Sequence, residues 1–135
     1  MFTIPHHAFE VPINIQQNDI DRLNHVNNTV YLKWVQEVAI ANWEHITTAE
    51  QRSKWIWVVA RHEIDYLRPC FLNDELLAYT WVVPAVERGS DRIVVFKNKA
   101  TGKIVTQVKS NWVLVDPVTQ RGTPITDEIK QLLGI

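Results

Sequence analysis

Apolar residues along this chain follow one helical period and several strand-like periods. In residues 29–46 they recur every three to four positions and form a broad stripe, which predicts one long amphipathic helix. Shorter stretches in which apolar residues alternate with polar ones or run together predict five strands, at residues 7–15, 56–67, 75–86, 92–98 and 103–115. Residues 126–133 predict a short final helix with Thr126 as its N-cap.

The order of these elements predicts an α+β fold. Turn residues separate the last four predicted strands, and short turns between consecutive strands favour antiparallel hairpins. The apolar stripe of the long helix is broad, and Ile40 and Trp43 extend it further around the cylinder. A single antiparallel sheet can bury such a helix only by curling around it, so we expect a wrapped helix. The edges and outer face of that sheet still need cover, which predicts a homo-oligomer, either a dimer or a tetramer.

Composition restricts the classes of function. The chain has 135 residues, which predicts a single domain over residues 1–135, and its formal net charge is −1. Neither nucleic acid nor an anionic membrane is therefore an expected partner. No stretch approaches the roughly 18 apolar residues of a spanning helix, and the first residues lack the pattern of a secretory signal. The single cysteine, Cys70, cannot form a disulfide within the chain and fits a reducing cytoplasm.

Polar residues concentrate immediately before the long helix, in residues 18–28 (NDIDRLNHVNN). One interpretation is a turn rich in Asp and Asn that ends in a helix cap, with Asn27 or Asn28 accepting from the first-turn amides. A cap needs only one such residue, whereas this loop also carries Asp19, Asp21 and His25. A carboxylate and an imidazole beside the unpaired amides of a helix N-terminus are groups that acyl transfer or hydrolysis needs.

Other chemistries receive less support. The sequence contains no G-x-S-x-G nucleophile motif, no glycine-rich nucleotide-binding loop and no calcium-binding loop. Cys70 follows a proline in a predicted turn, so we expect a buried structural cysteine and not a nucleophile. A metal held by Asp21, His25 and the distant His62 is an alternative, although no C-x-x-C or H-x-x-x-H spacing accompanies it.

Two segments of the sequence resemble one known family. The first is the spacing Asp19-x-Asp21-x-x-x-His25-Val26-Asn27-Asn28-x-x-Tyr31, which runs into a helix that carries Trp and Glu. The second is RHEIDYLRP at residues 61–69, followed by NDEL at residues 73–76. Both resemble the signature of hot-dog-fold thioesterases, in the branch of 4-hydroxybenzoyl-CoA thioesterase, bacterial acyl-CoA hydrolases and plant acyl-ACP thioesterases. The resemblance covers nearly the whole chain and implies one long helix wrapped by a curled five-stranded antiparallel sheet.

Carried over by position, the resemblance implies a role for each of three residues. Asp21 matches the family's catalytic carboxylate, a nucleophile or a general base toward water. His25 matches a histidine that holds the thioester or the attacking water, and Asn28 falls where a backbone N–H meets the thioester carbonyl. Three departures accompany the match: Asn24 stands where the family often has glycine, and Leu23 and Pro69 stand where the plant enzymes place further catalytic groups.

The resemblance also implies the substrate class. We expect an acyl-CoA or acyl-carrier-protein thioester, a role in fatty acid metabolism, no cofactor and no metal, because a thioester carbonyl is already electrophilic. Tyr31, Arg61 and Arg68 are the predicted substrate-binding residues. The basic side chains that could meet the substrate phosphates, or simply lie solvated at the surface, are Arg61, Arg68, Arg88, Lys97 and Lys99.

Two other functions would share this fold. A hot-dog hydratase or dehydratase would act on the same thioesters, but it would be expected to carry a different arrangement of histidine and acid. A non-catalytic module would bind acyl thioesters without hydrolysing them. The presence of both Asp21 and His25 favours catalysis over simple binding. The identity of the acyl chain depends on the shape of the pocket, which no motif in the sequence specifies.

Overall fold

The computed structural model describes residues 2–135. Two of its helices and its five strands lie where the sequence predicts them. In chain order the elements are β1 (Phe9–Ile13), a 3₁₀ turn (Gln17–Asp19), α1 (Asn28–Ile46), α2 (Ala49–Lys54), β2 (Ile56–Tyr66), β3 (Leu76–Pro84), β4 (Ser90–Asn98), β5 (Ile104–Val115) and α3 (Asp127–Leu133). The predicted strand at residues 7–15 is shorter, because only Phe9–Ile13 pairs with β3.

The short helix α2 was not predicted, although its sequence contains a starting signal. The Thr48 side chain accepts from the Gln51 amide at 3.2 Å, and the Gln51 side chain accepts from the Thr48 amide at 2.8 Å. This reciprocal arrangement is a capping box, which satisfies two backbone donors that a helix start leaves free. The helix has only 6 residues, too few for a clear apolar period.

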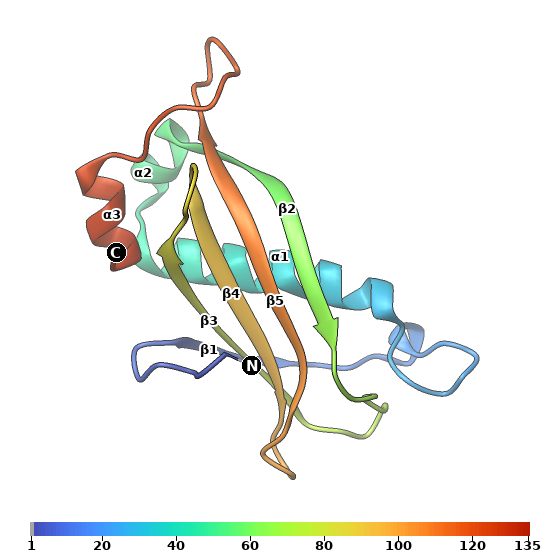
Figure 1. The fold of residues 1–135 in the computed structure, drawn as a ribbon. Coiled ribbons are helices and arrows are strands. Elements are labelled where there is room, and N and C mark those ends of the chain that lie inside the picture. Colours follow the sequence, from blue (N-terminus) through green and yellow to red (C-terminus); the bar gives the residue numbers. More distant parts are fainter. Residues whose placement is uncertain (1) are drawn as a thin grey trace.

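The strands form one antiparallel sheet in the order β1-β3-β4-β5-β2 (Figure 1). The hairpins β3–β4 and β4–β5 confirm the prediction for those turns. The prediction of a hairpin between β2 and β3 is wrong, because β2 pairs with β5 at one edge while β3 pairs with β1 toward the other. The intervening loop keeps its own contacts: the Leu67 and Arg68 amides both donate to the Val105 carbonyl, at 2.9 and 3.0 Å.

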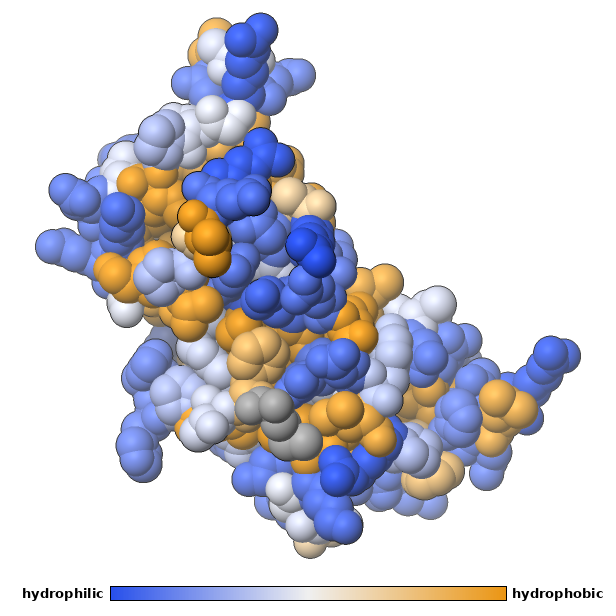
Figure 2. Space-filling view, in the orientation of Figure 1, coloured by the Kyte–Doolittle hydropathy of each residue, from blue (hydrophilic) through white to orange (hydrophobic). Residues whose placement is uncertain are grey.

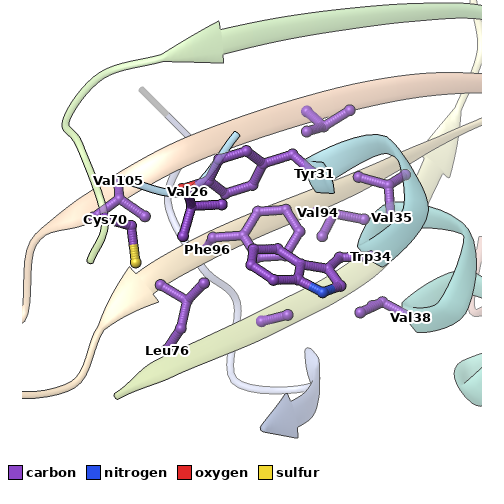
Figure 3. Close-up of a cluster of buried hydrophobic side chains, with 12 residues drawn as sticks. Val26, Tyr31, Trp34, Val35, Val38, Cys70, Leu76, Val94, Phe96 and Val105 are labelled. Atoms are coloured by element: carbon purple, nitrogen blue, oxygen red, sulfur yellow. The ribbon is translucent and has the colours of Figure 1, made fainter. Parts of the chain in front are cut away.

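The helix α1 lies across one face of the curled sheet, passing behind it in Figure 1. Its buried side chains pack onto the sheet face that carries Leu76, Ala78, Val94, Phe96 and Val108. Figure 3 shows Tyr31 and Trp34 from α1 against Phe96 from β4, and the ring centroids of Tyr31 and Phe96 are 5.2 Å apart. This apolar contact is the main core of the fold and fixes the start of α1 relative to the sheet.

The far side of α1 is not covered by this chain. Leu32, Lys33, Gln36, Glu37 and Ile40 are exposed, and Ile40 keeps 55% of its surface accessible. Ile40 extends the apolar surface of the helix as the sequence indicates, but it stays largely exposed in a single copy, because the sheet curls around the other side of the helix. None of the helices among residues 2–135 is long and apolar enough to cross a membrane.

The outer face of the sheet is covered in part by the first residues of the chain. Phe2, Ile4 and Ala8 pack against a second apolar cluster, whose buried members are Trp81, Ile93 and Val95. Figure 2 shows this side of the molecule as a mosaic of hydrophobic and hydrophilic residues. The central strands β3 and β4 are consequently buried on both faces, while β2 remains at an edge.

Candidate active site

The polar segment before α1 folds back on itself as a small hairpin. Ile20 and Val26 pair as an isolated antiparallel bridge, and the Asp21 amide donates to the His25 carbonyl at 3.0 Å. The Asn24 amide donates to the Asp21 carbonyl at 3.0 Å, and Asn24 has a φ of 68°. Glycine adopts this left-handed conformation without cost and asparagine tolerates it best among the other residues, which explains the asparagine where the family often has glycine.

Asp19 anchors the base of this hairpin. Its side chain is buried, and its Oδ2 accepts from the Gln16 amide at 2.8 Å. Its carbonyl accepts from the Asn27 amide at 2.9 Å, and the neighbouring Val26 amide donates to the Cys70 carbonyl at 2.7 Å. These bonds join the loop to the start of α1 and to the segment after β2. The geometry gives Asp19 a role in holding the loop together.

Asp21 and His25 face each other at the tip, each with a half-buried side chain. Asp21 Oδ1 accepts from the Leu23 amide at 2.9 Å, while Oδ2 lies 3.7 Å from His25 Nδ1. The same Nδ1 lies 3.3 Å from the Val26 carbonyl, which holds the ring in place when that nitrogen carries the proton. One carboxylate oxygen is therefore held by the backbone, and the other is available beside the imidazole.

The first turn of α1 begins one residue after Asn27. The Asn27 side chain accepts from the Thr29 amide at 3.0 Å and from the Thr29 hydroxyl at 2.9 Å, so Asn27 is the N-cap. Among residues 2–135 no acceptor binds the Asn28 amide. That exposed N–H lies at the positive end of the helix dipole and is a donor ready for an oxyanion.

Tyr66, which the sequence analysis did not single out, contacts Asn28 in the first turn of α1. Its hydroxyl donates to the Asn28 carbonyl at 3.0 Å and so ties the end of β2 to the first turn of α1. Its only signal in the sequence is its place within the second family-like segment, residues 61–69.

Two groups beneath the loop are buried in the core. Tyr31 is enclosed by Trp34, Phe96 and Tyr66, and burial raises the pKa of its hydroxyl to about 12. Burial, with a smaller effect of Asp74, also raises the pKa of the Cys70 thiol to about 12. A thiol with this pKa is protonated at neutral pH, which removes the thiolate that a nucleophile needs. Figure 3 shows Cys70 and Tyr31 within the same cluster as Val26.

The predicted phosphate-binding residues are not all near the loop. Arg68 lies just after the end of β2, and its Nη1 donates to the Ile104 carbonyl at 2.6 Å. Arg61 is on β2 itself, paired with Glu63, and the strand rise places it about 17 Å from Tyr66. Lys97 lies over the ring of Tyr79 on β3, with Nζ 5.8 Å from the ring centroid, and Lys99 pairs with Glu75.

The alternative metal site does not assemble. Within residues 2–135 no group of three His, Cys, Asp or Glu side chains is placed to hold a metal ion. His62 instead lies 2.6 Å from the Ser110 hydroxyl, Nδ1 to Oγ, and burial lowers its pKa. Asp21 and His25 thus form a pair without the third residue that this alternative required.

Residues 15–133 match the family model of the thioesterase-like superfamily. The chain belongs to the thioesterase-like superfamily. This membership and the helix lying against a curled five-stranded sheet together confirm the predicted hot-dog fold.

Three thioesterases show how similar this chain is to known proteins. It is 28% identical over 124 residues to oleoyl-acyl carrier protein thioesterase 2 of Arabidopsis thaliana, over 91% of this chain and 34% of that protein. It is 23% identical to the long-chain acyl-CoA thioesterase FadM of Escherichia coli, over 92% of this chain and 96% of that protein. A Thermus thermophilus thioesterase, solved with coenzyme A and Zn, is 26% identical with a TM-score of 0.76, over 92% of this chain and 90% of that one. The chain spans only 26% to 34% of the first plant relatives.

Proposed function

We propose that this chain hydrolyses acyl thioesters of coenzyme A or of a carrier protein, releasing a free acid and a thiol. The observation that carries the proposal is the Asp21–His25 pair beside the unpaired amide of Asn28, in a chain of the thioesterase-like superfamily. Its relatives act on both kinds of thioester, according to their names. The choice between coenzyme A and a carrier protein therefore belongs to experiment.

Each residue has a distinct part in the proposed reaction. The Asp21 carboxylate either attacks the thioester carbonyl or takes a proton from the attacking water. The carbonyl oxygen becomes negative, and the Asn28 N–H stabilises it, an effect of ~3 kcal/mol for one pre-oriented donor. His25 holds the water or the thioester in place. In the general-base route, the sulfur leaves as a thiol with one proton of the water and the acid keeps the hydroxyl. In the nucleophilic route, Asp21 forms an anhydride with the acyl group as the carbon–sulfur bond breaks. Water then hydrolyses the anhydride, which gives the hydroxyl to the acid, a proton to the thiol and restores the Asp21 carboxylate.

A homo-oligomer, a dimer or tetramer with active sites between subunits, forms the second part of the proposal. The edge strand β2 has 11 residues, and within the described chain its outer edge has no partner strand. Ile56 and Val58 on this strand and Ile40 on α1 are exposed apolar side chains. An exposed edge and an apolar helix side are surfaces that a second copy would cover. The buried free thiol of Cys70 fits a location in the reducing cytoplasm.

The test is release of free thiol from a panel of acyl-CoA and acyl-carrier-protein thioesters, with a chelator present and without added metal or nucleotide. We expect hydrolysis of at least one thioester and loss of that activity in Asp21→Asn. Binding of acyl thioesters without any thiol release above background would instead identify a non-catalytic binding module. Light scattering at micromolar concentration tests the oligomer, and a monomer would contradict it.

A further inference from the structure

An apolar cavity lies between the second half of α1 and the β2 end of the sheet, away from the loop that carries Asp21. It has a volume of about 670 Å³, and α1 contributes Ala39, Ile40 and Trp43 to its wall. Tryptophans supply much of the rest, with Trp55, Trp57 and Trp112 also in the lining. Such a cavity suits the hydrocarbon part of an acyl group. The charged side chains in its lining bear on which kind of acyl group it can hold.

One wall of the cavity contains a buried cation. Arg92 on β4 is only 5% exposed, and burial lowers the pKa of its guanidinium to about 10, so it stays protonated at neutral pH. Its Nη1 donates to Asn42 Oδ1 at 2.9 Å and to Thr80 Oγ1 at 3.0 Å. Both acceptors are neutral, and no ion pair among residues 2–135 includes Arg92. These two bonds orient the guanidinium and leave its Nε and Nη2 donors without a protein acceptor.

Two unpaired donors near the cavity are enclosed by protein and do not meet a ligand in it. The indole N–H groups of Trp57 and Trp112 are buried, and neither has a hydrogen-bond acceptor in the described protein. A buried charge without a counter-ion is unfavourable, and this applies to the Arg92 guanidinium. Arg52, the other arginine of the lining, bonds through Nη1 to the Thr47 and Glu44 carbonyls and is a second, more exposed cation at the cavity. None of the residues known to line the cavity is an Asp or a Glu.

We infer that this cavity binds a carboxylate carried by the acyl group, with the buried Arg92 guanidinium as its counter-ion. A carboxylate matches the Arg92 guanidinium because it only accepts hydrogen bonds and can take two of them from one guanidinium. The substrate class is then an acyl thioester with a second carboxyl group remote from the thioester. This inference rests on the proposed hydrolysis of thioesters for its substrate, but the carboxylate site itself does not depend on catalysis.

The length of α1 sets the length of such a substrate. Asn42, which holds Arg92, lies fourteen residues after Asn28, and the helix rise makes this separation about 21 Å. A thioester held at the Asn28 amide would therefore need an acyl chain that spans about this distance to place its far carboxylate at Arg92. A hydrocarbon terminus would leave the buried guanidinium without a counter-ion, and that unpaired charge opposes its binding.

A binding experiment tests the site without any turnover. Quenching of tryptophan fluorescence is measured with decanoate and with 1-decanol, because four tryptophans line the cavity. We expect decanoate to bind at least about tenfold more tightly than the alcohol, the scale of hydrogen bonds to a charged group. Arg92→Met should abolish this difference, and Arg92→Lys should retain part of it. Arg121→Met, at an exposed arginine between β5 and α3, should change nothing.

Kinetics then test the substrate class. Thioesters of equal chain length that end in a carboxyl, a hydroxyl or a methyl group are compared by kcat/KM. The carboxyl-terminated substrate should be preferred by about tenfold or more, and Arg92→Lys should reduce that preference. Equal rates for the three substrates, or a preference for the hydroxyl or methyl terminus, would overturn the inference even if Arg92→Met does not fold. Decanoate could bind in an Arg92-dependent way while no thioester is hydrolysed. That result would refute the proposed function but support the carboxylate site.

Discussion

Asp21 and His25 are joined twice across one turn, by their backbones and by their side chains. The Asp21 amide donates to the His25 carbonyl at 3.0 Å, and Asp21 Oδ2 lies 3.7 Å from His25 Nδ1. The backbone bond closes the turn and so keeps the two side chains on the same side of it. The Asn27 cap then places the unpaired Asn28 amide directly after this pair in the chain. The following predictions test this arrangement.

Substitution of Asp21 should lower the activity more than substitution of Asp19. Asp21→Asn is nearly isosteric and still accepts a hydrogen bond, so folding should survive while kcat falls by roughly 10²-fold or more. Asp19→Asn, the matched control, keeps an acceptor for the Gln16 amide and should cost less activity. Asp19→Ala removes that acceptor and should lower the stability by about 1–3 kcal/mol. A larger loss of kcat at Asp19 than at Asp21 would reverse the assigned roles.

Proline substitutions should separate the amide of Asn28 from the helix start itself. Proline lacks the N–H but is tolerated in a first turn, and the ψ of 134° at Asn27 is what a residue before proline prefers. Asn28→Pro should therefore fold with a near-native Tm and lose about 10²-fold or more in kcat. Asn28→Ala keeps the N–H and should retain activity within about tenfold.

Thr29→Pro is the control for the proline experiment. It removes the amide that bonds to the Asn27 side chain and leaves the Asn28 amide intact. We expect a loss of about 1 kcal/mol in stability and little change in kcat. If Asn28→Pro folds and turns over normally, stabilisation of an oxyanion at the helix start is the wrong mechanism.

Asn24 should tolerate glycine and resist branched residues. Its φ of 68° lies in the left-handed region, where a β-branched side chain is strained by about 1–2 kcal/mol. Asn24→Gly should have a Tm close to that of the wild type, and Asn24→Val should lower it by several degrees. Thermal melts of both variants provide the measurement, and an unchanged Tm for Asn24→Val would show that the turn relaxes in solution.

The Cys70 thiol should behave as a buried core group. Because its pKa is raised to about 12, the thiol stays protonated through neutral pH and becomes thiolate only as the pH approaches that value. Labelling by a thiol reagent at pH 7 should be slow in the native protein and fast after denaturation. Cys70→Ala should keep kcat within about tenfold and lose about 1 kcal/mol of stability. Loss of all activity in a folded Cys70→Ala protein would favour a thiol nucleophile.

The edge of β2 should be needed for assembly. Ile56→Lys places a charge on this exposed strand, and two copies that pair there would bring these charges together or bury them. We expect a smaller particle by light scattering and a parallel loss of thiol release. Val86→Lys, at a fully exposed apolar residue after β3, is the matched control and should change neither property.

The sequence by itself determined the elements whose signals are local. The long helix was predicted from residue 29 and begins at Asn28, because a cap and an apolar period lie within its own residues. The five strands were found for the same reason, and the resemblance of the residues around Asp21, His25 and Asn28 to a known family suggested the reaction. The capping residues Thr48 and Gln51 also indicate the start of α2 in the sequence, although its 6 residues are too few to show an apolar period.

The tertiary structure decided what depends on contacts between residues far apart in the chain. Turn composition could not show that β2 pairs with β5 and not with β3, because strand order is set by which faces can be buried together. Residue types alone could not separate Asp19 from Asp21, although the family resemblance assigned catalysis to Asp21. The folded loop adds the physical difference, because it buries the Asp19 carboxylate and leaves that of Asp21 beside His25. Arg92, Trp57 and Trp112 come from three different strands, so they line one cavity only when the sheet has curled around α1.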